Sequence, residues 1–76
     1  MNKLVVQNLN VGVDVGKDFL DIHIRPLGEY LKVSNDKKGI GEAIKRLRKL
    51  TVERIVIEAT GRYEIAFVSA CAKAAL

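Results

Sequence analysis

The sequence has few of the residues that hold small proteins together through covalent bonds or bound metal. Its 76 residues include one cysteine and one histidine. A single cysteine excludes an internal disulfide, and one cysteine with one histidine cannot form a Cys/His metal site. These shortages favour a reducing cytoplasm as the compartment. We expect Cys71, which lies among alanines, only to pack against its neighbours.

Long apolar runs are also missing. No stretch approaches the roughly 18 apolar residues needed to span a bilayer, and the first residues lack the apolar core of a signal peptide. We therefore expect a soluble, intracellular protein with no membrane segment. A chain of 76 residues forms at most one domain. A domain of that size buries only about 60% of its unfolded surface, so its stability is marginal.

Neither sign of charge dominates the composition. Thirteen Lys and Arg stand against nine Asp and Glu, which gives a net charge of +4. This balance favours nucleic acid or another anionic ligand as a partner without requiring either. Four of the cations gather in one predicted helix and its end: Lys45, Arg46, Arg48 and Lys49. They form either a solvated surface or a face that follows phosphates.

The first half of the chain has the two-residue period of β-strands. Apolar and polar residues alternate in Val11–Val15 and again in Phe19–Arg25, and Glu29–Ser34 makes a third strand. Pro26 and Gly28 end the second strand. The connections are short, and a parallel return needs a dozen or more residues, so the three strands should form an antiparallel meander.

A helix, a strand and a second helix should follow. Asp36 is a suitable N-cap for a helix whose apolar residues are spaced three and four apart. Those residues are Ile40, Ala43, Ile44, Leu47 and Leu50. The nearly continuous apolar run Arg54–Glu58 predicts a strand covered on both faces and parallel to a neighbour. The last helix, Tyr63–Leu76, is apolar nearly all round, which predicts burial on several sides.

Two carboxylates are the strongest functional signal. Asp14 and Glu58 each lie where an apolar strand meets a tight turn. A charge within an apolar strand costs several kcal/mol unless a partner compensates it. If the first and fourth strands are adjacent and parallel, both acids lie at the sheet edge where α/β folds build their sites. Two such oxygen ligands suit Mg²⁺ or Mn²⁺. The alternative is that Asp14 only accepts backbone N–H groups at its turn.

Cationic and aromatic residues flank these acids. Lys17 is either a solvated turn lysine or a cation near a scissile phosphate. Arg62 is better placed, because it should lie beside the acids at the start of a helix, where anions are favoured. Tyr63 either stacks on a nucleotide or covers the sheet. Asp21 and His23 are expected to be ordinary surface residues.

Three further residues are assigned structural roles. Thr60 is a suitable N-cap for the last helix, and Gly61 permits a close approach of the backbone. Gly12 is grouped with them as a structural turn residue. Its spacing to Gly16 and Lys17 is one residue short of a phosphate-binding loop, so that motif is rejected.

With these residues in place, the chain resembles the amino-terminal part of the DEDD-type transposases of the insertion-sequence 110 family. The opening Val11-Gly-Val-Asp-Val-Gly-Lys-Asp18 is similar to the family's Gly-Ile-Asp-Val-x-Lys-Asp. The segment Asn35–Gly39 and, most specifically, Glu58-Ala-Thr-Gly-Arg-Tyr-Glu64 also match. The resemblance implies a ribonuclease H-like domain in which four acids bind divalent metal for DNA strand cleavage and joining.

Carried over by position, Asp14 and Glu58 correspond to the first two acids, so both are assigned as catalytic metal ligands. The other two acids would lie beyond this chain. Residues 11–76 would then be an incomplete catalytic domain behind an extension of residues 1–10, and the piece alone is expected to be inactive. DNA is the implied partner, and a guide RNA assists some relatives.

Two other interpretations remain open. The sugar-kinase and actin-like ATPases share this fold and begin with a similar Gly-x-Asp-x-Gly strand, but Lys17 replaces their usual hydroxyl residue. The chain could instead be a non-catalytic remnant that binds DNA or dimerises. Under any of these interpretations, the apolar Ile65–Leu76 segment predicts self-association.

Overall fold

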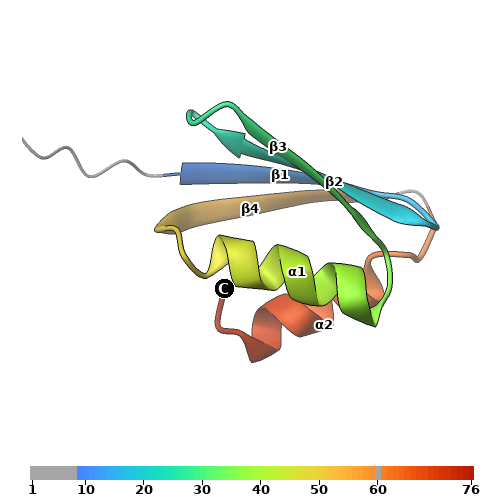
Figure 1. Ribbon diagram of the computed structural model, residues 1–76. Coiled ribbons are helices and arrows are strands. Elements are labelled where there is room, and N and C mark those ends of the chain that lie inside the picture. Colours follow the sequence, from blue (N-terminus) through green and yellow to red (C-terminus); the bar gives the residue numbers. More distant parts are fainter. Residues whose placement is uncertain (1–8, 60) are drawn as a thin grey trace, which may run out of the picture.

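The computed structural model describes residues 9–59 and 61–76. Six elements follow one another along the chain (Figure 1). They are β1 (Leu9–Val15), β2 (Phe19–Arg25), β3 (Glu29–Ser34), α1 (Lys37–Leu47), β4 (Val52–Ala59) and α2 (Ile65–Lys73).

The strands form one mixed sheet in the order β3-β2-β1-β4. β1, β2 and β3 pair antiparallel, and β4 lies parallel to β1. The predicted α/β fold, with an antiparallel meander, a helix, a parallel strand and a second helix, is therefore confirmed. This is the order expected for the first part of a ribonuclease H-like fold.

Both helices lie on the same face of the sheet, which we call the covered face (Figure 1). Every second residue of the first two strands points into the core between sheet and helices. The buried set from these strands is Leu9, Val11, Val13, Val15, Leu20, Ile22 and Ile24. Leu47 of α1 and Phe67 of α2 are fully buried against them. Burying one such side chain stabilises the fold by roughly 1.5–3 kcal/mol.

The start of α1 is fixed by its cap and by a close contact. The Asp36 carboxylate accepts the backbone N–H of Gly39 at 2.8 Å, which confirms the predicted N-cap. A Cβ added at Gly39 would lie 1.9 Å from the carbonyl oxygen of Ser34. Only glycine lets the first turn of α1 approach the end of β3 this closely.

Cys71 is buried between α2 and the rest of the core, as predicted. Burial raises the pKa of its thiol. A buried thiol that stays protonated is unreactive, so Cys71 serves packing.

Several predicted boundaries were wrong. β1 begins at Leu9 instead of Val11, so two residues of the predicted extension 1–10 belong to the sheet; residues 1–8 lie outside the described residues. β4 spans Val52–Ala59, longer than the predicted Arg54–Glu58. α1 ends at Leu47, before Leu50, and α2 spans Ile65–Lys73 within the predicted 63–76.

The predicted burial of β4 and α2 was also wrong. β4 is covered on one face only, and Val56 on its other face is 49% exposed. In α2 only Phe67 and Cys71 are buried. The reason is that both helices share one face of a four-stranded sheet, so α2 contacts neighbours along a single stripe. None of the helices in the described ranges is long and apolar enough to cross a membrane.

Candidate metal centre

The face of the sheet opposite the helices, which we call the open face, carries the polar residues of the strands. Successive residues of a strand point to opposite faces, so each core residue alternates with one on this face. The residues of the open face that matter below are Asn10, Gly12, Asp14, Asp21, His23, Arg25, Tyr30, Lys32, Val56 and Glu58.

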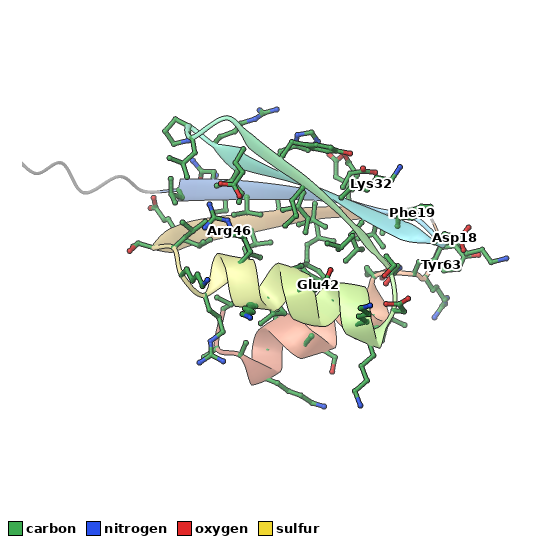
Figure 2. The ribbon with its side chains drawn as sticks, viewed as in Figure 1. Asp18, Phe19, Lys32, Glu42, Arg46 and Tyr63 are labelled. Carbon is green, nitrogen blue, oxygen red and sulfur yellow. The ribbon has the colours of Figure 1, made fainter. Side chains whose placement is uncertain are left out.

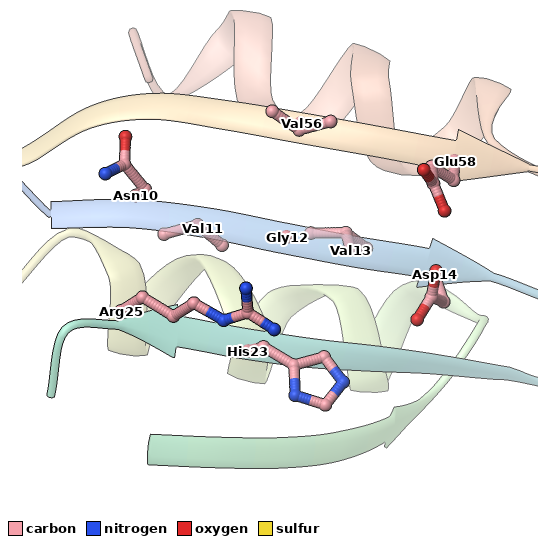
Figure 3. A pocket seen from close by; sticks show the side chains of 9 residues that line it. All are labelled: Asn10, Val11, Gly12, Val13, Asp14, His23, Arg25, Val56 and Glu58. Carbon is pink, nitrogen blue, oxygen red and sulfur yellow. The ribbon is translucent and has the colours of Figure 1, made fainter. Parts of the chain in front are cut away.

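Asp14 and Glu58 are direct partners across the parallel β1–β4 ladder. Neighbouring strands lie about 4.8 Å apart, so the two carboxylates are within reach of one ion. Figure 3 shows both side chains on the same side of the sheet, with the Glu58 carboxylate directed toward β1. The prediction that the first and fourth strands are adjacent and parallel, with both acids near their carboxyl ends, is confirmed.

A third acid, Asp21, belongs to the same row. It is the partner of Asp14 across the antiparallel β1–β2 ladder, so Asp21, Asp14 and Glu58 form a line across three strands that we call the acid row. The Tyr30 hydroxyl donates a hydrogen bond to the Asp21 carboxylate, and this bond raises the pKa of Tyr30. Asp21 is partly exposed, which agrees with its expected surface position, but it also accepts the Tyr30 hydrogen bond and belongs to the acid row.

The signal for Asp21 was available in the sequence. Residues 16–18 form the short connection between β1 and β2, and Val15 pairs with Leu20. Moving one residue away from the turn on each strand places Asp14 opposite Asp21. The spacing that predicts the hairpin therefore also gives its register.

None of the three acids of the row forms an ion pair within the described part of the chain. Like charges placed directly opposite each other in a sheet are destabilising. The ion pair found among residues 9–59 and 61–76 joins Arg46 to Glu29, on another side of the molecule. In that part of the chain, no three His, Cys, Asp or Glu residues are grouped tightly enough to hold a metal ion together. The arrangement therefore offers a cation two carboxylates, Asp14 and Glu58, with its other positions left for water or substrate oxygens.

Asn35 ties together the two loops that follow the acids. Its side-chain amide donates to the carbonyl oxygens of Gly16 at 2.8 Å and Tyr63 at 3.0 Å. Its backbone N–H donates to the carbonyl oxygen of Asp18 at 2.8 Å. The loop after β1 and the turn after β4 are thus held by one side chain. Sequence reasoning cited Asn35 only within a matching segment and missed this role.

Lys17, a predicted phosphate ligand, shares a pocket with one of the acids. It lines a shallow pocket with Asp14, Asp18 and Lys32. Lys32 is the β3 partner of Asp21, and its ammonium lies 4.5 Å from the centre of the Phe19 ring (Figure 2). Cations therefore border the acid row at its Asp21 end.

The residues around α2 differ from their predicted places. The N-cap position of α2 is Glu64, without a side-chain cap bond, and Thr60 lies outside the described residues. Arg62 is exposed in the turn before α2, which begins at Ile65, so its predicted position at the start of the helix was wrong. Tyr63 is 46% exposed in the same turn, and Gly61 has a positive φ of 78°, which agrees with its predicted backbone role.

The basic residues of the first helix are not part of this site. Lys45 and Arg46 lie in α1, on the covered side of the sheet, while Arg48 is the C-cap and Lys49 follows it. Arg46 donates two hydrogen bonds to the Glu29 carboxylate, which lower the pKa of Glu29. The structure therefore does not bring these cations to the acid row.

Gly12 lies in the middle of β1, so its predicted role in a turn was wrong. A Cβ added there would meet no atom within 4 Å. A hollow of about 310 Å³ lies over it on the open face (Figure 3). Around it lie Asn10, Asp14, His23, Arg25, Val56 and Glu58. His23 also packs on Tyr30, with ring centroids 4.9 Å apart.

No protein-family model matches the chain, and no curated protein matches it significantly.

Proposed function

We propose that Asp14 and Glu58 bind Mg²⁺ or Mn²⁺, and that the chain is the amino-terminal part of a DNA transposase catalytic domain. The observation that carries the proposal is their direct pairing across β1 and β4. A lone strand acid has many structural explanations, but two acids in one row, neither of them in an ion pair among the described residues, favour a bound cation. The matching segments around both acids support the choice of reaction class.

In this proposal the protein positions the metal ion and provides the negative charge that binds it. A divalent ion at such a site polarises a phosphate and stabilises the charge that develops on its oxygens. Asp14 and Glu58 hold the ion from two rigid strands, and Asn35 keeps the two following loops in place. Lys17 is positioned to contact the phosphate beside Asp14. Arg62 and Tyr63 extend the nucleic-acid surface along the turn after β4.

The test is whether metal increases the affinity for DNA through these two acids. Fluorescence anisotropy of a labelled duplex should show tighter binding with Mn²⁺ than with EDTA. Asp14→Asn and Glu58→Gln should each abolish this increase. Glu53→Gln removes the same charge from an exposed position near the other end of β4 and should leave the increase intact.

Two outcomes would contradict the proposal. One is an increase that survives both Asp14→Asn and Glu58→Gln. The other is ATP binding without any DNA binding, which is the behaviour that the ATPase alternative predicts. Cleavage and joining of DNA are proposed for the whole catalytic domain, acting in the cytoplasm; metal and DNA binding are proposed for the residues of this chain.

We also propose that the chain self-associates through the outer stripe of α2. Ile65 is 60% exposed and Val68 is 43% exposed on that stripe, beside Leu76 at 40%. Light scattering should detect a dimer or larger species that Val68→Glu converts to a monomer. A monomer at high concentration for the unaltered chain would contradict this.

A further inference from the structure

The end of the open face that lies away from the acid row carries a positive charge. Arg25 of β2 pairs with Asn10 of β1, four residues before Asp14 along the same strand. With about 3.3 Å per residue, the two ends are roughly 13 Å apart along the sheet. Arg25 is exposed and forms no ion pair within the described ranges. A cationic side chain without a protein partner can receive an anion.

Between these two ends lies the hollow above Gly12. Gly12 is the partner of both His23 and Val56, so one row supplies a bare backbone floor with an imidazole on one side and an aliphatic side chain on the other. His23 is held by its packing against Tyr30, whose hydroxyl donates to Asp21. Figure 3 shows the Arg25 side chain running along β2 toward His23.

These features suit a flat ring that carries a phosphate. At about 310 Å³ the hollow is at the lower end of pockets that hold small ligands, about 300–1,000 Å³. A base can reach an aromatic side chain on a protein surface only when it is unpaired, and such stacking tolerates any base. The Arg25 guanidinium matches the geometry of a phosphate.

We propose that the hollow above Gly12 binds one nucleotide of a single-stranded DNA segment, with its base over Gly12 against His23 and its phosphate on Arg25. The strand then continues toward Asp14 and Glu58. This inference rests on the proposed function in one respect, because it assigns the single strand as the form of the DNA that approaches the acids. The binding itself needs no metal.

Gly12→Val is the sharpest test, because it places a branched side chain in the middle of the hollow, where the added Cβ meets no other atom. The added Cβ has open space, and a valine favours a strand more than a glycine does, so the variant should be at least as stable as the unaltered chain. Binding of a labelled oligothymidine of about 12 nucleotides, measured by anisotropy in EDTA at low salt, should weaken by about tenfold or more.

Arg25→Gln tests the phosphate contact separately. Affinity should fall about five- to tenfold, and the slope of log affinity against log salt should decrease by about 0.7. Lys73→Gln is the matched control, because it removes one exposed positive charge at the end of α2. It should change the affinity by less than about twofold. A duplex of the same length should bind more weakly than the single strand.

The outcomes separate this inference from the metal proposal. Asp14→Asn and Glu58→Gln should tighten binding of the single strand in EDTA, because they remove negative charge near the strand, and should abolish the increase that Mn²⁺ gives. The inference is overturned if a folded Gly12→Val variant binds like the unaltered chain, or if Arg25→Gln acts no more strongly than Lys73→Gln. Absence of single-strand binding by the unaltered chain, or equal binding of the duplex, also overturns it.

Discussion

The two faces of the sheet are built from the same strands but are governed by different forces. On the covered face, alternate residues such as Val13 and Ile22 are almost fully buried, and the core contains no buried charged group among the described residues. On the open face, their sequence neighbours Asp14 and His23 border a hollow. The alternation lets one strand build a core and a site at once.

This comparison teaches that the open face can change without loss of the fold. The apolar surface that stabilises the protein lies under the helices, whereas the acid row adds like charges that oppose folding. Residues that destabilise the fold without an evident compensating interaction are typical of functional sites. The predictions below test whether the stability of the fold depends on the covered face and not on the open face.

The largest effect should come from removing a core side chain. Ile22→Ala deletes a fully buried residue and should cost about 2–5 kcal/mol in the free energy of unfolding. His23→Ala, the next residue on the open face, should cost about 1 kcal/mol or less. Urea denaturation measures both. Equal losses in the free energy of unfolding would contradict the distinction between the faces.

A smaller effect is expected at the start of the helix that covers the sheet. The Gly39 N–H and then the Ser34 hydroxyl hold the pKa of Asp36 below its ordinary value of 3.8. Its contribution to stability is therefore present above that value and is lost as the pH falls through the lower folded pKa. At neutral pH, Asp36→Ala should lower the melting temperature, and the difference should shrink in acid.

Asp36→Asn is the control for this pH dependence. Asparagine caps a helix about as well as aspartate but does not titrate. This variant should stay close to the unaltered chain at neutral pH. A difference between Asp36→Ala and the unaltered chain that is independent of pH would show that the charge of Asp36 plays no part.

On the open face the sign of the effect should reverse. In EDTA, Asp14→Asn should stabilise the fold by roughly 0.2–1 kcal/mol, because it relieves repulsion from Asp21 and Glu58. With Mn²⁺ the unaltered chain should gain stability and the variant should not. Thermal unfolding of the unaltered chain and of the variant, in EDTA and in Mn²⁺, measures these two effects. Destabilisation by Asp14→Asn in EDTA would mean that the acid has a structural role instead.

The smallest effect should come from the ion pair that joins β3 to α1. Glu29 and Arg46 are both partly exposed, so solvent screens their attraction. A double-mutant cycle with Glu29→Gln and Arg46→Gln should give a coupling close to the limit of detection, which high salt removes. A strong coupling that persists in high salt would show that charge also contributes to the stability of the covered face.

Sequence periodicity predicted the fold more fully than the surroundings of the site. The two-residue alternation in Val11–Val15 and Phe19–Arg25 identified the hairpin, and the apolar run after α1 identified the parallel strand. The same run was misleading about burial, because Ile55, Val56 and Ile57 are all apolar although Val56 faces outward. Periodicity cannot show which face of an apolar strand remains uncovered.

The candidate site was predicted in part. Asp14 and Glu58 follow from strand ends and topology, which local patterns reveal. Asp21 required the exact register, and Asn35 required knowing which loops approach each other in space. Arg62 lies further from the helix than predicted, because the apolar pattern of the segment did not show how long the turn before α2 is. Of these errors, only the one about Asn35 arises from contacts between distant segments; the other two concern the register of one hairpin and the start of one helix.

The most direct test of the account is a Mn²⁺ titration followed by electron paramagnetic resonance of the free ion. The unaltered chain and Glu53→Gln should bind the ion, whereas Asp14→Asn and Glu58→Gln should each lose binding. Unchanged binding in both of the last two variants, or no binding by the unaltered chain, would contradict the claim that Asp14 and Glu58 share a metal ion.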